Sequence, residues 1–145
     1  MARIEQFTTV SAPPEKAFDY LADIARHTEW GSHITSAEKA SDAPIAAGST
    51  FTTVGKLFGI HRAEVKIAEL VPNQKIVYES QDDSGHFRHE FTLNPGDGGT
   101  TLTKSVEALK ITGPLKLFSP LLPLLSRRNM ATDLKKIKER LEAQA

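Results

Sequence analysis

The side chains in this sequence that are best suited to acid–base chemistry are Tyr78 and His89. They fall in two consecutive strand-like runs, 74–82 and 85–94. An imidazole titrates near neutral pH and a phenol can donate a proton, so the pair could act as base and acid on a ketone-bearing substrate. The alternative is that the two side chains hydrogen-bond each other, or orient a ligand without chemistry. No third group is placed in the sequence to orient His89 as a base.

The remaining histidines do not form a metal-binding pattern. His86 and His89 are three residues apart on an expected strand, so they point to opposite faces and cannot share an ion. His27 and His33 flank a turn around Trp30, no carboxylate cluster occurs at ligand spacing, and there is no cysteine. Phosphate-binding loops, dinucleotide motifs and nucleophile elbows are also absent. We therefore expect no metal and no other cofactor.

Turn and periodicity signals predict the elements that carry these side chains. A β-rich run at 3–10 precedes a helix over 14–22, which Pro14 can begin, and a second short helical turn from Asp23 towards Trp30. After Gly113, a leucine-rich segment predicts a long C-terminal helix that is broken around two prolines. Between the helices, strand-like runs separated by turn residues lie near 33–40, 49–58, 60–71, 74–82, 85–94 and 100–110.

This order predicts an α+β fold, in which a seven-stranded antiparallel sheet curves around a long C-terminal helix and two short helices follow the first strand. The chain has 145 residues, which is typical of one domain, spanning 1–145. Eighteen basic and eighteen acidic side chains cancel, so nothing favours a nucleic-acid partner. The sequence begins MARIEQFTTV, without a signal peptide's apolar core, and contains no apolar run long enough for a membrane span. We expect a cytoplasmic protein.

The hairpin turns predict which side chains share a face of the sheet. Tips at Pro72-Asn73, Asp83-Ser84, Gly59 and Asp97-Gly98 predict the cross-strand pairs Ile67–Tyr78, Tyr78–His89, Leu57–His61, Gly55–Ala63 and Phe91–Lys104. All of these side chains lie on one face, and charged side chains collect on the other.

This inner face mixes bulky residues with small ones such as Ala63 and Ser80, and it carries His61, Tyr78 and Lys104. A cavity with apolar walls and a few polar anchors would account for this mixture. Alternatively, the small residues accommodate the helix and the polar ones lie at the rim of the sheet. The ammonium group of Lys104 is expected at the rim, with its aliphatic stem inside.

The C-terminal segment is apolar first and basic afterwards. Residues 113–145 carry seven basic and three acidic side chains, net +4, against net −4 for 1–112. Because an apolar stripe from Met130 to Leu141 commits one helix face to the sheet, we expect the leucines of 115–125 to be mostly buried and membrane contact to be absent. The alternative is a lipid-handling or interaction surface formed by Leu115, Leu117, Phe118, Leu121 and Leu122 with Lys116, Arg127 and Arg128.

Four segments resemble a known family: APPEKAF at 12–18, VPNQKIVY at 71–78, GGTTLT at 98–103 and DLKKIK at 133–138. With the element order, the sequence resembles the START-like helix-grip (SRPBCC) superfamily, and within it the polyketide cyclase/dehydrase and lipid transport group. The resemblance implies a sheet that grips the C-terminal helix around a cavity for lipids, polyketides, hormones or similar molecules. Some such proteins are enzymes and many only bind, so the fold does not settle the activity.

We therefore predict the binding or carriage of a hydrophobic small molecule between the sheet and the C-terminal helix, by a monomer or homodimer. The alternative is a polyketide cyclase/aromatase or dehydratase acting in the same cavity, with Tyr78 and His89 as its catalytic candidates. Trp30 either gates the cavity mouth or caps the core. The expected ligand-binding residues are Trp30, Phe51, His61, Ala63, Tyr78, Phe87, His89 and Leu122.

Overall fold

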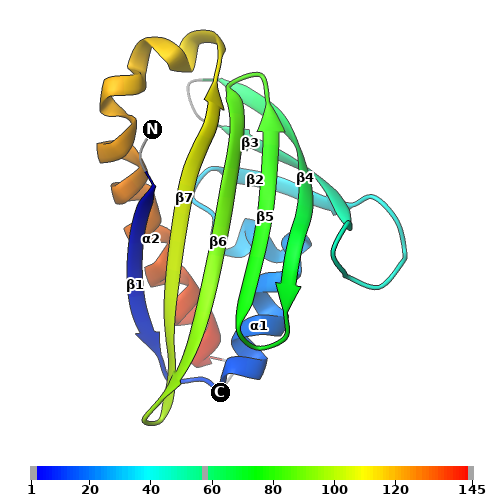
Figure 1. Cartoon of the computed structure of the whole chain (residues 1–145), viewed down its shortest axis with the longest axis vertical. Coiled ribbons are helices and arrows are strands. Elements are labelled where there is room, and N and C mark those ends of the chain that lie inside the picture. The colour runs from blue at the N-terminus through cyan, green and yellow to red at the C-terminus, as the bar shows by residue number, and fades with distance from the viewer. Residues whose placement is uncertain (1–2, 57–58, 144–145) are drawn as a thin grey trace.

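A computed structural model describes residues 3–56 and 59–143, with the backbone alone at 114–115 and 118–119. The strands and helices follow the predicted order (Figure 1). They are β1 (Ile4–Val10), α1 (Pro14–Ala22), η1 (Ile24–Glu29), β2 (Ile34–Lys39), β3 (Thr50–Lys56), β4 (Ile60–Val71), β5 (Lys75–Asp82), β6 (Gly85–Gly96), β7 (Gly99–Ile111), η2 (Gly113–Leu121) and α2 (Leu122–Ala143). Here η1 and η2 are 3₁₀ helices.

The seven strands form one antiparallel sheet in the order β1-β7-β6-β5-β4-β3-β2. Strands β2 to β7 form a meander in chain order, and β1 joins it at the far edge by pairing with β7. The helices α1 and α2 lie on the same side of the sheet, behind it in Figure 1. The predicted α+β helix-grip fold is confirmed, and the face covered by the helices is the inner face.

Most of the predicted register is confirmed. Ile67 pairs with Tyr78, Tyr78 with His89, and Phe91 with Lys104. The hairpins therefore place Tyr78 at the centre of the inner face, flanked by a strand on each side.

The predicted register of the β3–β4 hairpin is wrong by two residues. Gly55 pairs with His61, and Ala63 pairs with Thr53. The last pair is Lys56 with Ile60, so the turn between these strands is centred before Gly59 rather than on it. Because side chains alternate with a period of two, a slip of two residues keeps every side chain on its predicted face. The predicted partner Leu57 lies outside the described residues.

The helices form where the sequence predicts them. Pro13 is extended and Pro14 begins α1, whose first turn carries Glu15 near the positive end of the helix dipole. In the C-terminal segment, the 3₁₀ helix η2 contains Pro120, and α-helical hydrogen bonding starts at Leu122. The predicted break around the prolines is thus a change of helix type.

The predicted burial of the leucines at 115–125 is wrong. Leu117 is 82% exposed, Leu121 54% and Leu124 69%, whereas Leu122 is buried. The side chains of Leu115 and Phe118 lie outside the described residues. The physical reason is the position of the segment: η2 starts just after β7 ends, beyond the end of the sheet (Figure 1).

The part of α2 from Met130 onwards packs against the sheet as predicted. Met130, Leu134, Ile137 and Leu141 are all buried, at spacings of three and four residues along the helix. They join the core formed with α1 and the inner face. After Leu122, which is buried at the start of α2, the next buried side chain is Met130, about two turns further along the helix.

Candidate functional site

Lys104 is the residue around which the interior is organised. Its side chain is 8% exposed, and Nζ lies 3.8 Å from Oδ2 of Asp133 on α2. The ammonium also lies 4.8 Å from the Trp30 ring and 5.3 Å from the Phe91 ring, distances at which the faces of aromatic rings attract a cation. The prediction that the ammonium reaches the rim is wrong, because Asp133 and the two rings provide a partner and electron-rich faces inside.

Asp133 connects three separate parts of the chain. Its Oδ1 accepts hydrogen bonds from the backbone N–H of Ser32, at 2.9 Å, and from the Ser32 hydroxyl, at 2.5 Å. Its Oδ2 faces Lys104 of β7. The carboxylate therefore ties the loop after η1 and the strand β7 to helix α2.

Burial and charge act in opposite directions on the Lys104 ammonium. Removal from water lowers the pKa of Lys104, and the Asp133 carboxylate raises it again to a smaller extent. The charged form of Lys104 therefore depends on Asp133, because attraction to the carboxylate offsets part of the free energy lost when the ammonium is removed from water.

Sequence reasoning missed both Asp133 and Ser32. One signal for Asp133 was available: it stands three residues after Met130 and four before Ile137, inside the apolar stripe of the helix. A carboxylate within such a stripe is buried with the apolar residues and requires a partner. The sequence contained no comparable signal for Ser32.

Trp30 lies in the core. It is 1% exposed, and its ring centroid lies 4.4 Å from that of His27 and 5.8 Å from that of Phe91. Of its two predicted roles, this placement supports capping of the core over gating of a mouth. The indole Nε1 is buried and finds no hydrogen-bond partner among the described residues.

His27 is a buried structural histidine. Its Nε2–H donates to the carbonyl of Leu21 over 3.0 Å, which fixes the tautomer. Burial lowers the pKa of His27 to about 3, although the Leu21 hydrogen bond opposes the shift. The ring is therefore neutral under ordinary conditions, and its edge faces Tyr78.

Tyr78 and His89 are neighbours, as predicted, but their rings stack. The centroids are 4.7 Å apart and the planes differ by 8°. The Nε2 atom of His89 lies 3.2 Å from the Ser80 hydroxyl, and its buried Nδ1 has no partner within the described part of the chain. The hypothesis that Tyr78 and His89 hydrogen-bond each other is therefore wrong.

The protonation states of this pair follow from burial. Burial, followed by the positive charge of Lys104, lowers the pKa of His89 to about 3. Burial, together with the Asp133 carboxylate, raises the pKa of Tyr78 well above its usual range. At neutral pH His89 is uncharged and Tyr78 keeps its proton, so both are suited to hydrogen bonding with a ligand.

The inner face is divided into a closed part and a partly open part. Towards the end where β5 begins, Ile76, Phe91 and Leu102 are completely buried. Towards the other end, the inner-face side chains are half-buried, although the helices lie on this side of the sheet. The half-buried residues are Gly55, His61, Ser80, Phe87, His89 and Val106.

The predicted ligand-binding residues are distributed over both parts. Trp30, Phe51, Ala63, Tyr78 and Leu122 are buried. His61, Phe87 and His89 are half-buried. The structure thus brings Trp30, Tyr78 and His89 into one ring cluster, and leaves the side chains of the open part as the accessible portion of the inner face.

One possible metal-binding cluster was missed. His61 Nδ1 lies 2.5 Å from Asp83 Oδ1, and one ligand atom from each of His61, Asp82 and Asp83 lies within 4.8 Å of the others. Asp82 Oδ1 already accepts hydrogen bonds from Ser84 and Gly85. The expectation that no such group forms is corrected, since the start of β4 and the β5–β6 turn meet here from distant parts of the sequence.

His86 and His89 point to opposite faces, as predicted. His86 Nε2 lies 2.8 Å from Glu79 on the outer face, where Arg88 also approaches Glu79 at 3.4 Å. The outer face therefore carries the paired charges that the alternation predicted.

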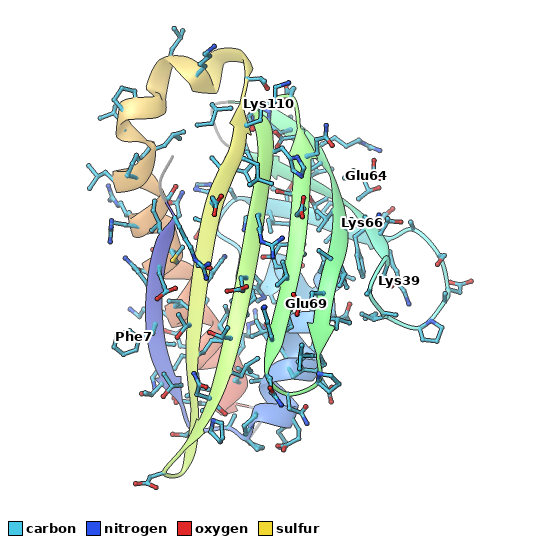
Figure 2. All side chains as sticks on the ribbon, in the orientation of Figure 1. Phe7, Lys39, Glu64, Lys66, Glu69 and Lys110 are labelled. Atoms are coloured by element: carbon cyan, nitrogen blue, oxygen red, sulfur yellow. The ribbon has the colours of Figure 1, made fainter. Side chains whose placement is uncertain are left out.

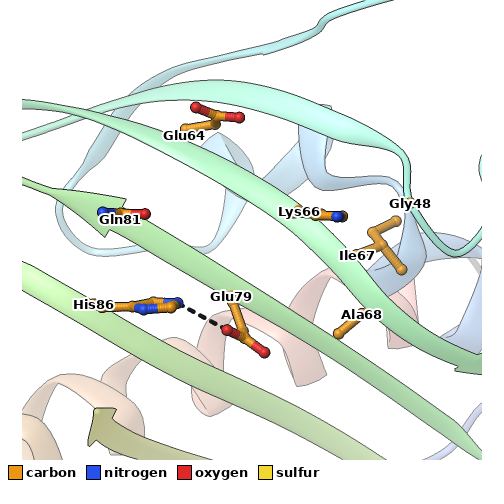
Figure 3. A pocket seen from close by; sticks show the side chains of 8 residues that line it. All are labelled: Gly48, Glu64, Lys66, Ile67, Ala68, Glu79, Gln81 and His86. Carbon is orange, nitrogen blue, oxygen red and sulfur yellow. Dashed lines mark ion pairs between the residues drawn. The ribbon is translucent and has the colours of Figure 1, made fainter. Parts of the chain in front are cut away.

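A hollow of about 610 Å³ also lies on the outer face (Figure 3). Its lining is Gly48, Glu64, Lys66, Ile67, Ala68, Glu79, Gln81 and His86. A second hollow, of about 420 Å³, adjoins β3 and β4. Both linings mix polar and apolar surface, and they differ from the predicted apolar space between the sheet and α2, which stays a prediction.

The fold and the sequence identify the protein's class. Residues 1–142 match the family described as polyketide cyclase / dehydrase and lipid transport, so the chain belongs to this family. No curated protein matches significantly.

Solved structures share the fold at low sequence identity. A protein of Thermus thermophilus superposes with a TM-score of 0.82 at 19% identity, covering 99% of both chains. The Zhui aromatase/cyclase of Streptomyces sp. R1128 gives 0.81 at 17% identity, covering 97% of this chain and 93% of its own. A START superfamily protein of Mycobacterium smegmatis gives 0.80 at 15%, covering 99% of both. At such identities, the similarity shows the fold alone.

The Lys104–Asp133 pair can be tested by a double-mutant cycle in urea unfolding. Asp133→Leu leaves a buried ammonium without its carboxylate, so the free energy of unfolding should fall by about 3 kcal/mol. Lys104→Met leaves a buried carboxylate and should cost a similar amount. The double variant should be clearly more stable than the sum of the two losses predicts. Additive losses would show that the two groups do not interact.

The lowered pKa values of His27 and His89 predict a dependence of stability on pH. Their pKa of about 3 in the folded protein lies below the ordinary 6.5. The unfolded chain therefore takes up protons first as the pH falls, and stability is complete above about pH 6.5 and declines below it. Between pH 7 and 5, each histidine should contribute a loss of about 1–2 kcal/mol.

Urea unfolding at pH 7 and pH 5 measures this loss. His89→Gln should remove about half of it, and His86→Gln, a change on the outer face, should remove little. An equal pH dependence in wild type and His89→Gln would contradict the buried neutral state of His89.

Proposed function

We propose that the protein binds a hydrophobic small molecule, such as a lipid or polyketide, between the partly open inner face and α2. The observation that carries the proposal is the half-burial of inner-face residues on the side that the helices cover. Apolar side chains there, such as Phe87 and Val106, would supply most of the affinity. Membership of a family that includes lipid transport supports the same class of ligand.

The polar groups beside this region would orient the ligand. Two buried polar atoms, Trp30 Nε1 and His89 Nδ1, have no partner in the described part of the chain. An unpaired buried polar atom costs free energy that a ligand oxygen or hydroxyl, or an ordered water, recovers. A ligand with one polar end and an apolar body fits this arrangement, with the polar end towards Ser80 and His89.

Titration with the apolar fluorophore N-phenyl-1-naphthylamine tests the location. The wild-type protein should bind the probe with one-to-one stoichiometry. Val106→Trp fills the open part from β7 and should weaken binding at least about tenfold, since the probe would have to displace the indole. The matched control is Glu107→Trp, whose side chain starts from the next residue on the opposite face, and its affinity should stay within about twofold of wild type.

Circular dichroism and thermal unfolding establish that both variants fold. If folded Val106→Trp binds the probe as tightly as wild type, the ligand does not lie on the inner face. If both variants weaken binding equally, the effect does not distinguish the two faces and the proposed location is wrong.

A second candidate function is cyclisation or dehydration of a polyketide in the same space. The similarity of fold to the Zhui aromatase/cyclase favours it. Neutral His89 could then accept a proton from a substrate carbon next to a ketone, with the nearby Lys104 ammonium stabilising the enolate oxygen. The raised pKa of Tyr78 limits that residue to donating a hydrogen bond.

His89→Gln separates the two candidates. For a carrier, the variant should keep its fold and lose at most about tenfold in ligand affinity, because one neutral hydrogen bond is worth about 1 kcal/mol. Substrate conversion of a synthetic poly-β-ketone would be followed by mass spectrometry with wild type and variant. Conversion by wild type that His89→Gln abolishes, with probe binding intact, would replace the carrier function by the enzymatic one.

A further inference from the structure

The exposed apolar side chains of this protein are concentrated at one end. Among the side chains that the structure describes, the large apolar ones that are exposed are Phe7, Ile60, Leu109, Leu117, Leu121 and Leu124. All except Phe7 belong to segments near the turns β3–β4 and β7–η2, or to the start of α2. Single exposed apolar residues are ordinary, but a group at one end of a molecule is not.

The strand directions place these segments at the same end of the sheet. Strands β3 and β7 run towards this end and β4 starts from it, because Lys56 pairs with Ile60 and Gly85 pairs with Ile111. Helix η2 then continues from β7 across the same end and leads directly into α2 (Figure 1). We call this group of Ile60, Leu109, Leu117, Leu121 and Leu124 the apolar end.

The charged side chains around the apolar end are mainly basic. Lys56, Lys110, Lys116, Arg127 and Arg128 are all exposed there. Figure 2 shows Lys110 at this end, whereas Phe7 lies on the edge strand β1, away from it. The acidic side chains nearby include Asp82 and Asp83 at the end of β5, and Asp83 is already paired with His61.

We propose that the apolar end docks on the surface of an anionic lipid bilayer. Exposed aliphatic side chains bordered by lysines and arginines suit the boundary between lipid headgroups and acyl chains. No described helix is long and apolar enough to cross a bilayer, so the contact is peripheral. The expectation that membranes are not contacted rested on buried leucines, and the exposure of Leu117, Leu121 and Leu124 removes that basis.

Charge favours a bilayer over a second copy of the chain. In a two-fold dimer through the apolar end, the basic side chains of both copies would face one another and repel. An anionic bilayer attracts the same side chains by about 1 kcal/mol each near its surface. The inference does not depend on the ligand-binding proposal, since it concerns the outside of the molecule.

Co-sedimentation with vesicles tests the docking surface. Ligand-free protein should pellet with vesicles of phosphatidylcholine and phosphatidylglycerol, and much less with phosphatidylcholine alone. Leu117→Ser/Leu121→Ser/Leu124→Ser should lower the partition coefficient at least about tenfold, from the lost apolar contact. The matched control is Phe7→Ser, which removes an equally exposed apolar side chain from β1 and should bind like wild type.

The contribution of charge is tested by Lys116→Glu/Arg127→Glu/Arg128→Glu, which should lose the preference for anionic vesicles. Thermal unfolding checks folding, and Leu117→Ser alone serves if the triple leucine variant does not fold. Val106→Trp, which fills the proposed ligand site, should bind vesicles like wild type. The vesicle test therefore does not depend on whether the ligand-binding proposal is correct.

Four results would overturn the proposal. The wild-type protein could stay in the supernatant with anionic vesicles. The leucine variants could bind as wild type does, or Phe7→Ser could lose as much as they do. Finally, analytical ultracentrifugation could show a dimer that the leucine variants dissociate, without vesicle binding, which would make the apolar end a self-association surface.

Discussion

The interior of this protein depends on the ionic contact between Lys104 and Asp133. Withdrawing an ammonium and a carboxylate from water costs several kcal/mol for each. The cost is tolerable only because Ser32 donates two hydrogen bonds to Asp133 and two aromatic rings face Lys104. The pair therefore constrains where helix α2 can lie on the sheet, since any shift along the helix axis would separate these groups.

The same contact explains the chemistry of its neighbours. With Lys104 positively charged and water largely excluded, protonated imidazole is unfavourable at both His27 and His89. The two imidazole rings are therefore neutral. Together with the Tyr78 ring they present flat faces for stacking and edge atoms for hydrogen bonding. Because the pKa of Tyr78 is raised and that of His89 is lowered away from neutral pH, the two side chains do not form a preassembled acid–base pair.

The fold separates two kinds of surface along its length. At one end, the sheet, α1 and the part of α2 from Met130 onwards form a closed core. Towards the other end the inner face is half-buried, and η2 extends past the sheet with exposed leucines. The basic charge of residues 113–145 begins in this second region, so accessible inner face, apolar side chains and positive charge occur at the same end of the molecule.

Local rules in the sequence were sufficient for the strands, for helix α1 and for most of the inner face. Alternation with a period of two and the turns at Asn73, Ser84 and Gly98 determine which side of the sheet Tyr78 and His89 occupy. The β3–β4 register was wrong because the length of that turn is not encoded in Gly59 alone. Each side chain of this hairpin nevertheless lies on its predicted face, because the error in register was an even number of residues.

Only the tertiary structure decided which distant groups meet and where the sheet ends. The partner of Lys104 is Asp133 on helix α2, which is separated from β7 by η2. No local pattern in the sequence specifies the position along the strands at which α2 packs on the sheet. Because of this position of α2 along the strands, Met130 is buried and Leu124 is exposed, although both are apolar residues of one helix. Periodicity determines the face of a side chain, whereas burial and ion pairing depend on what the rest of the chain places opposite it.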